Sequence, residues 1–594
     1  MNFFFLYPIV MSIIWMIGGT YFYFRYERNS PELPQLKEFP MVTIIIPAHN
    51  EGDHIVETVE GALKSEYPNY EILVVDDGST DNTLLYIEEL AAKHERVRAL
   101  VLKNNMGKAA ALNNGLLMSK SDILVTIDAD CILDSKALHW IVYHFIRFPR
   151  VGAVTGNPRV RNRTTLLAKI QNGEYSSIIG LIKRTQRLLG KVLTVSGVIA
   201  AFRRQAIIDS GMWDTDMVTE DINITWKLEK RFWAVHYELN AIGWILVPET
   251  PSGLWKQRVR WAQGGIEVLR RHKDIWLSWK QRRLWPIYID YLLSILWAYG
   301  LLFFTALWIV NAYFGTAIPG WMMLNPIPQW IGSMIALVCL IQFVISMAID
   351  SKYDSTLYQH YVWVIWYPAI YWLFNAFALI RALPKALFKR IGVAALWKSP
   401  DRGLHVVKSG SEAAPTLSSA MANSDSVIID AHHLVSTQRK IVEGTLVASG
   451  LTILSLGLIF LTLVIWFFMG TYFYNHLLVP AYIGDMDATI DMLSNLFLFA
   501  LFVFLVFFIW AKYNIKFYAH LDRRHNVGET SPNLLARMLN TTPQAVITAQ
   551  NFKISIMEVT EKHMHIQAYE GSYSVPVQDN DVLTVPKKLS GGQQ

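Results

Sequence analysis

The chain has 594 residues, of which 52% are hydrophobic and only 17% are charged. Soluble proteins carry about 25% charged residues, so this composition indicates extensive contact with lipid. The net charge of +6 is modest and indicates no nucleic-acid partner. The two cysteines, Cys131 and Cys339, have no partners at metal or disulfide spacing, which excludes a disulfide framework.

The first predicted element is a transmembrane anchor at residues 1–28. The apolar run from Phe3 to Phe24 is long enough to cross a bilayer. It lacks the basic start and the small-residue cleavage site of a signal peptide. Arg25 and Arg28 follow the run, and the positive-inside rule then predicts that the chain continues in the cytoplasm.

A cytoplasmic α/β domain is predicted at residues 38–250. Short β-branched runs, such as Val42–Pro47 and Glu71–Asp76, alternate with stretches of helical periodicity, such as His54–Ser65. This alternation is typical of a mostly parallel sheet that is covered by helices on both faces. Such sheets bind ligands at the carboxyl ends of their strands.

Apolar runs return beyond the α/β domain. The sequence predicts interfacial amphipathic helices at 251–286, transmembrane helices at 287–384, a cytoplasmic linker at 385–430, a transmembrane hairpin at 431–530 and a small cytoplasmic tail at 531–594. Three full crossings within the transmembrane stretch would leave Lys385 and Arg390 outside the cell, against the positive-inside rule. We therefore expect one run, the one that contains Pro368, to be tilted, re-entrant or interfacial, and the number of crossings stays open.

Acidic residues recur where predicted strands end. Asp76-Asp77-Gly-Ser79 and Asp128-Ala-Asp130 each end a strand, Thr219-Glu220-Asp221 follows later, and Gln257-Arg-Val-Arg260-Trp261 precedes the membrane runs. Taken singly, each has an ordinary structural explanation as a turn, a chance pair, a helix cap or an interfacial anchor. Their order and their placement at strand ends together indicate a catalytic site.

With these motifs, residues 41–265 resemble family 2 glycosyltransferases of the processive, polysaccharide-synthase kind. Pro47-Ala48-His-Asn-Glu51 belongs to the same motif set. The runs Val151–Pro158, Gly173–Arg187, Thr194–Arg203 and Ser399–Gly403 resemble the bacterial branch that makes poly-β-1,6-N-acetylglucosamine. The resemblance implies an α/β domain of the GT-A type, with a mostly parallel nucleotide-binding sheet, embedded between transmembrane helices. A related synthase of hyaluronan, chitin or cellulose remains the alternative.

The resemblance also implies roles for single residues. A donor such as UDP-N-acetylglucosamine carries two phosphate charges, for which we expect Mg²⁺ or Mn²⁺ held by Asp128 and Asp130. Asp221, beside Glu220, is the expected base for the acceptor hydroxyl in an inverting transfer. The other implied contacts are Pro47, Ala48, Glu51, Asp77 and Lys108 with the nucleotide, Arg260 with the leaving pyrophosphate, and Trp261, on one helix face with Gln257, with the acceptor sugar.

The predicted C-terminal α-helical hairpin resembles the small two-span accessory subunit that accompanies these synthases. The likeness lies in Ser426–Asp430 and Trp510–Asn514, and the family's subunit is normally a separate polypeptide. The resemblance implies activation by cyclic di-GMP, with Arg184, Arg187, Asn514 and Lys516 as candidate contacts; ordinary positive-inside flanking is the alternative for the basic residues. It further implies a multi-pass protein of the bacterial inner membrane whose partners are the lipid bilayer, the growing polysaccharide, a periplasmic deacetylase and outer-membrane export proteins.

Overall fold

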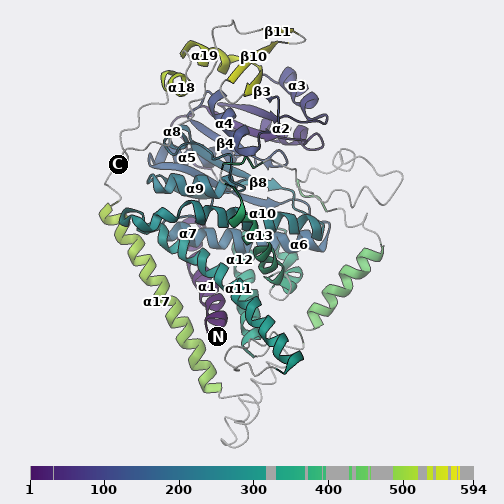
Figure 1. Cartoon of the computed structure of the whole chain (residues 1–594), viewed down its shortest axis with the longest axis vertical. Helices are drawn as coiled ribbons and strands as arrows, with labels where there is room; N and C mark the ends of the chain where they lie inside the picture. The colour runs from purple at the N-terminus through teal and green to yellow at the C-terminus, as the bar shows by residue number, and fades with distance from the viewer. Residues whose placement is uncertain are drawn as a thin grey trace, which may run out of the picture.

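The computed structural model shows an α/β body from which long helices extend to one side (Figure 1). The structure describes residues 2–30, 33–315, 330–367, 372–390, 392–395, 427–430, 437–452, 455, 486–518, 532–539, 543–559, 564–570 and 573–575.

One sheet runs through the whole body, with the strand order β11-β10-β9-β3-β2-β1-β4-β7-β6-β8-β5. The strands are β1 (Val42–Ala48), β2 (Tyr70–Asp77), β3 (Val97–Leu102), β4 (Ile123–Ile127), β5 (Ile132–Leu133), β6 (Val151–Val160), β7 (Ile199–Arg203), β8 (Ala234–Ile245), β9 (Ile554–Val559), β10 (Met564–Glu570) and β11 (Tyr573–Val575). β3, β2, β1 and β4 run parallel, and β7 is antiparallel to both of its neighbours. The predicted mostly parallel sheet is therefore confirmed.

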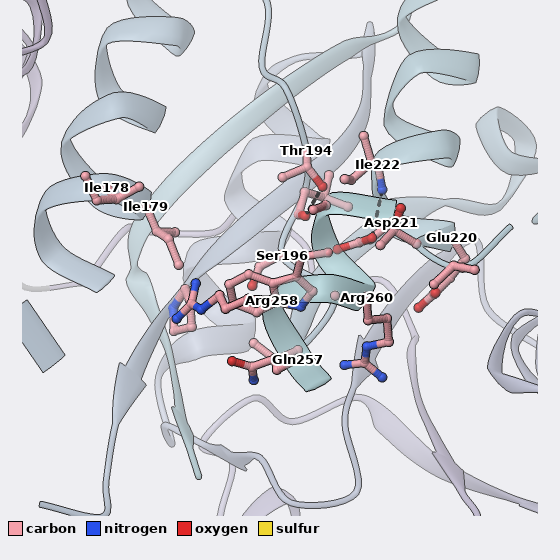
Figure 2. Close-up of a pocket in the computed structure, with 18 of the residues that line it drawn as sticks. Ile178, Ile179, Thr194, Ser196, Glu220, Asp221, Ile222, Gln257, Arg258 and Arg260 are labelled. Atoms are coloured by element: carbon pink, nitrogen blue, oxygen red, sulfur yellow. Dashed lines mark hydrogen bonds between the residues drawn. The ribbon is translucent and has the colours of Figure 1, made fainter. Parts of the chain in front are cut away.

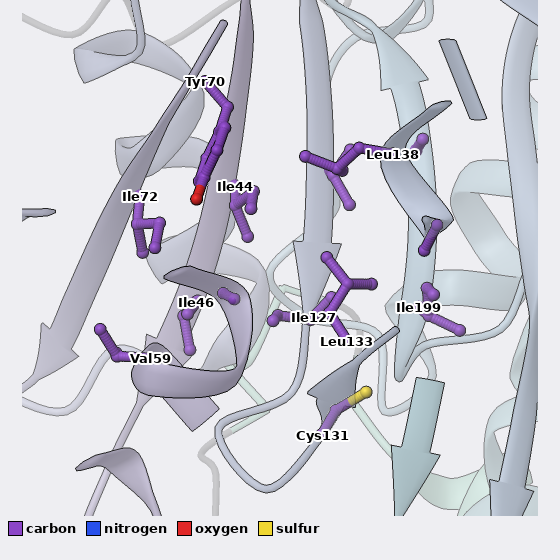
Figure 3. Packing of buried hydrophobic residues seen from close by; sticks show 14 of the residues in the cluster. Ile44, Ile46, Val59, Tyr70, Ile72, Ile127, Cys131, Leu133, Leu138 and Ile199 are labelled. Atoms are coloured by element: carbon purple, nitrogen blue, oxygen red, sulfur yellow. The ribbon is translucent and has the colours of Figure 1, made fainter. Parts of the chain in front are cut away.

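Helices cover both faces of this sheet, and the central strands are accordingly apolar at nearly every position. Ile44 and Ile46 pack on one face against Val59, as Figure 3 shows, whereas Ile45 packs on the other face against Leu112. Side chains of one strand alternate between faces, so a continuous apolar run fills both core layers. The helices of the body are α2 (Ile55–Leu63), α3 (Thr83–Lys93), α4 (Lys108–Met118), α5 (Ala137–Arg147), α6 (Leu166–Glu174), the π-helix η2 (Tyr175–Leu181), α7 (Ile182–Leu189), α8 (Arg204–Asp209) and α9 (Glu220–Lys230).

Two helices of the described residues are long and apolar enough to cross a membrane, Leu6–Glu27 and Trp279–Asn311. Shorter apolar helices span Ile335–Asp350 and Phe497–Tyr513. The elements concerned are α1 (Asn2–Phe22), the π-helix η1 (Tyr23–Glu27), the 3₁₀ helices η3 (Lys273–Leu277) and η4 (Trp279–Leu284), α11 (Trp285–Phe314), α12 (Trp330–Asp350) and α17 (Met486–Tyr518). Much of the first arm of the predicted hairpin lies outside the described residues, and α17 is its second arm.

The amphipathic helix α10 (Pro251–Arg271) lies between the body and the long helices. It begins where the Thr250 hydroxyl accepts a hydrogen bond from the Gly253 N–H, with Pro251 in its first turn. Alanines of α13 (Trp372–Phe388) pack along it, and Arg270 donates to carbonyls at the end of α13. The apolar run with Pro368, a residue outside the described ranges, thus gives the 3₁₀ helix η6 (Leu357–Trp366) and then α13 beside α10. Whether this run crosses a membrane stays a prediction.

A buried ion cluster joins the long helices to the body. Asp350, at the end of α12, lies 2.8 Å from Arg159 of β6 and 2.6 Å from Arg184 of α7. Arg184 also makes a two-pronged contact with Glu27, with N–O distances of 2.7 Å and 2.9 Å. Two cations and two anions therefore balance in a site where each side chain is nearly or wholly buried. The cluster therefore fixes the C-terminal ends of η1 and α12 to the body.

The described strands of the C-terminal tail belong to the sheet of the body. β9 pairs in parallel with β3, and α18 (Pro532–Leu539) and α19 (Pro543–Asn551) precede it. Leu535 and Val546 are buried in the same cluster as Leu102 of β3. Arg98 of the body donates to the Phe552 carbonyl over 3.1 Å. The described strands after residue 531 thus extend the sheet of the body, and the predicted domain boundary at that residue stays a prediction.

The segment before the hairpin also docks on the body. Ile429 donates its N–H to the Arg161 carbonyl and accepts from the Arg163 N–H, each over 2.8 Å. This short pairing places residues 427–430, part of the accessory-subunit resemblance, directly after the end of β6.

Candidate active site

A pocket of about 780 Å³ opens where the carboxyl ends of the strands meet α10. Figure 2 shows Ser196, Glu220, Asp221, Gln257 and Arg260 gathered around it. Its lining also includes Lys108, Asp128, Asp130, Lys183, Gly197, Arg258 and Trp261 from the body and α10, and Tyr291, Ser294 and Asn375 from α11 and α13. The volume suits a ligand of the size of a nucleotide sugar.

Lys108 joins the two acidic motifs of the pocket. Its Nζ lies 2.5 Å from Asp128 Oδ1 and 3.3 Å from Glu220 Oε1, and it donates to the Gly197 carbonyl over 3.0 Å. Burial lowers the pKa of Lys108, but the two carboxylates outweigh burial and raise the pKa above its usual value. The lysine thus stays charged and holds carboxylates from two distant motifs at one point.

Asp221 is half-buried at the first turn of α9, beside Glu220. Burial and the Glu220 charge raise the pKa of Asp221 to about 6, although Lys108 opposes them. A Cβ atom at position 197 would lie 3.1 Å from Asp221 Oδ2, so Gly197 lets the backbone approach the carboxylate closely. A carboxylate with a pKa near neutrality, aimed into a pocket, is suited to accept a proton.

The predicted face of α10 lines the pocket, since Gln257, Arg260 and Trp261 all belong to its wall. Arg258, which lies in the stretch that we predicted to be interfacial, is buried. It lies 2.7 Å from Glu174 and stacks over the Trp261 ring with its Cζ 4.4 Å from the centroid. Glu174 thereby positions Trp261 through Arg258. This pair carries no local sequence signal, because α6 and α10 are far apart in the chain.

The segment that builds this pocket is similar in sequence to known proteins. Residues 40–264 match the family described as "Glycosyltransferase like family 2". Poly-beta-1,6-N-acetyl-D-glucosamine synthase of Staphylococcus aureus (strain MSSA476) is 41% identical over 409 residues, which cover 68% of this chain and 98% of the relative. The synthase of the same name from Staphylococcus epidermidis is 40% identical over 412 residues, with the same two shares covered.

The chain belongs to glycosyltransferase family 2. A solved structure, mannosyltransferase PcManGT from Pyrobaculum calidifontis in complex with GDP-Man and Mn2+, aligns with the glycosyltransferase at a TM-score of 0.41 and 19% identity. The alignment covers 64% of this chain and 99% of that chain. The predictions of a GT-A-type α/β fold and of a glycosyltransferase activity are confirmed.

Asp128 and Asp130, the two carboxylates that we expect to hold a metal ion, both line the pocket. Within the described ranges, no group of three or more acidic, histidine or cysteine side chains converges on one point. Mg²⁺ is commonly bound by one or two carboxylates, with water and substrate phosphates completing its shell. The pair therefore fits a divalent ion that arrives with a nucleotide diphosphate, whose charge the ion would balance.

Four residues that we expected to contact the nucleotide are not among those that line this pocket: Pro47, Ala48, Glu51 and Asp77. Asp77 is fully buried, and its carboxylate accepts the N–H groups of Met106 and Gly107 over 2.8 Å and 2.7 Å. It therefore fastens the loop that leads into Lys108, and its contact with the nucleotide stays a prediction. Pro47 and Ala48 end β1, and the backbone N–H of the buried Glu51 donates to the Thr83 hydroxyl over 2.8 Å.

The predicted cyclic di-GMP contacts lie in different surroundings, as far as the structure describes them. Arg184 is wholly buried in the ion cluster with Glu27 and Asp350, so the prediction that it binds a regulator is wrong here. Arg187 is half-buried, and burial lowers its pKa to about 10. Lys516 is exposed on α17, and the side chain of Asn514 lies outside the described residues. α17 does pack beside α7, where Leu188 joins Ala500 and Phe504 in one cluster.

Proposed function

We propose that the protein polymerises N-acetylglucosamine from UDP-N-acetylglucosamine into a β-1,6-linked chain, processively and with inversion. The observation that carries this proposal is one pocket that joins the Asp128–Asp130 pair to Asp221 and continues to Tyr291 and Ser294 of α11. Donor chemistry and a path toward the membrane helices thus share one cavity. The staphylococcal relatives are named for this polymer, which supports the choice of sugar and linkage.

In the proposed transfer, an acceptor hydroxyl attacks C1 of the donor sugar. The new C–O bond forms as the bond from C1 to the diphosphate oxygen breaks, and the hydroxyl proton passes to Asp221. Attack from the opposite face converts an α-linked donor into a β-linked product. Arg260 and Lys108, which both line the pocket, would balance charge on the departing UDP, and Mg²⁺ or Mn²⁺ held by Asp128 and Asp130 would balance the rest.

The proposal extends to the membrane and to regulation. The basic residues after α1 favour a cytoplasmic catalytic body, and Tyr291, Ser294 and Asn375 would receive the growing chain on its way out. The accessory-like hairpin, through the contact of α17 with α7, would convey activation by cyclic di-GMP. Arg187 and Lys516 remain the candidate contacts for that regulator.

The test uses the full chain in lipid vesicles with radiolabelled UDP-sugars, followed by digestion with linkage-specific hydrolases. We expect UDP-N-acetylglucosamine to be consumed and the product to be cut by a β-1,6-specific hydrolase but not by a chitinase. Consumption of UDP-glucose alone, or a product that only chitinase or hyaluronidase cuts, would refute the choice of polymer and favour a related synthase.

A further inference from the structure

A second lysine lines the catalytic pocket, and the chemistry described above does not use it. Lys183 of α7 is 5% exposed. Lys108 meets two carboxylates, whereas in the described part of the chain no carboxylate lies within ion-pair distance of Lys183. Buried ammonium groups are normally paired, so an unpaired one in a pocket wall points to a missing partner.

The protein contacts of Lys183 use little of its bonding capacity. Its Nζ donates to the Thr155 hydroxyl over 3.4 Å, near the limit of a hydrogen bond, and lies 5.5 Å from the centroid of the Tyr237 ring. An ammonium carries three donors, and neither partner is a strong acceptor for them. Burial lowers the pKa of Lys183 to about 8, and the Asp221 charge limits this fall, so the ammonium form predominates at neutral pH.

Lys108 and Lys183 approach opposite ends of the Ser196–Gly197 dipeptide. Lys108 donates to the Gly197 carbonyl, and Thr155, the partner of Lys183, accepts the Ser196 N–H over 2.8 Å. Lys108 thus belongs with Asp128, on the side of the diphosphate. Of the described acidic groups, Asp221 is the one whose charge acts on Lys183. Lys183 therefore stands apart from the Lys108–Asp128 ion pair, on the wall of the pocket that Asp221 also lines.

We propose that Lys183 is an acceptor-binding residue whose ammonium donates hydrogen bonds to oxygens of the terminal sugar of the growing chain. This inference rests on the proposed function, because it takes a sugar as the acceptor. A sugar offers hydroxyl and ring oxygens but no charge, so it can occupy the free donors without displacing the Lys108 ion pairs. In the transfer the acceptor proton still passes to Asp221, and Lys183 keeps its protons and orients the reacting hydroxyl toward that base.

The decisive experiment separates acceptor binding from donor binding. Lys183→Met, which keeps the length of the side chain but removes its charge, is assayed with UDP-N-acetylglucosamine and short β-1,6-linked N-acetylglucosamine oligosaccharides. We expect the KM for the oligosaccharide to rise about 10- to 100-fold, the range expected for a lost hydrogen bond from a charged group. The KM for the donor, and the slow rate at which the protein hydrolyses the donor when no acceptor is present, should stay within about 3-fold of the values for the unmodified protein. Unchanged values would also show that the variant is folded.

Two further variants bracket this result. Lys183→Arg keeps the positive charge and should recover part of the lost acceptor affinity. Lys191→Met is the control, because Lys191 is a half-buried lysine whose pKa burial likewise lowers to about 8, but it donates to the Glu229 carbonyl over 3.3 Å and is not among the residues that line the pocket. The control should leave the KM for the oligosaccharide unchanged.

An unchanged acceptor KM in Lys183→Met would overturn the inference. So would equal rises for donor and acceptor, or a loss of UDP binding, because either would make Lys183 a donor contact or a structural residue. Failure of the proposed function would look different: the unmodified protein would then release no UDP from UDP-N-acetylglucosamine with any of these oligosaccharides.

Discussion

Removing the charge of Asp350 should loosen the joint between the long helices and the catalytic body. Asp350 lies between Arg159 and Arg184, and each of these three side chains is at most 2% exposed. The cluster with Glu27 contains two positive and two negative charges, so Asp350→Asn leaves one buried positive charge uncompensated. Breaking a buried pair from one side costs about 3–5 kcal/mol.

That cost translates into a measurable shift in thermal unfolding. For a domain of about 200 residues, 1 kcal/mol shifts the unfolding midpoint by about 2–4 °C, so we expect a fall of about 6–20 °C. The measurement is thermal unfolding of the purified protein in lipid nanodiscs. Asp274→Asn serves as control, because the Asp274 side chain is 55% exposed in its pair with Lys230 and should cost less than about 1 kcal/mol.

A double variant tests the charge argument itself. Arg159→Met combined with Asp350→Asn restores the balance of charges and should recover part of the lost midpoint, whereas independent effects would add. If Asp350→Asn lowers the midpoint no more than Asp274→Asn does, the buried cluster is not what holds α12 to the body.

Four further outcomes follow from the site and the sheet. Asp221→Asn should lower turnover at least about 100-fold while UDP still binds. Because the base must be ionised and its pKa is about 6, turnover of the unmodified protein should fall tenfold per pH unit below about pH 6. A flat pH profile would show that Asp221 is not the base. Asp130→Ala should weaken UDP binding in Mg²⁺, and EDTA should stop synthesis; undiminished synthesis in EDTA would refute the metal site. Arg187→Ala should raise the cyclic di-GMP concentration at half-activation, which polymer synthesis measures in a titration, and an unchanged value would exclude the residue. Leu535→Ala should cost about 2–5 kcal/mol and lower the thermal midpoint, unlike the exposed control Leu85→Ala, if the tail packs on the sheet.

Sequence patterns located the parts of the site that local geometry controls. The β-branched run at Val42 gave β1 within a residue or two, because a strand buried on both faces needs apolar side chains throughout. The spacing of Gln257, Arg260 and Trp261 predicted a shared helix face, and all three line the pocket. Asp221 at the first turn of α9 also agrees with the motif.

The remaining features depend on contacts between distant segments, which periodicity cannot show. Arg258 and Arg184 look like basic residues at a membrane surface, but each has a buried acidic partner on another element, Glu174 and Asp350 respectively. Asp77 lies at the end of a strand, like Asp128. Its carboxylate, however, accepts hydrogen bonds from the N–H groups of the loop before Lys108. The free donors of Lys183 become visible only when the walls of the pocket are assembled.

The pairing of β9 with β3 dictates an order of events during biosynthesis. β3 ends at residue 102, whereas its partner β9 begins at residue 554, and the long helices α11, α12, α13 and α17 lie between them in the chain. While the chain is being translated, the hydrogen-bonding groups of β3 on that side have no strand beside them, which is a site for wrong pairing. The catalytic body can therefore reach its final form only after the ribosome has released the last part of the chain. Any truncation that removes the tail, even one far from every catalytic residue, should yield a protein that is prone to aggregation.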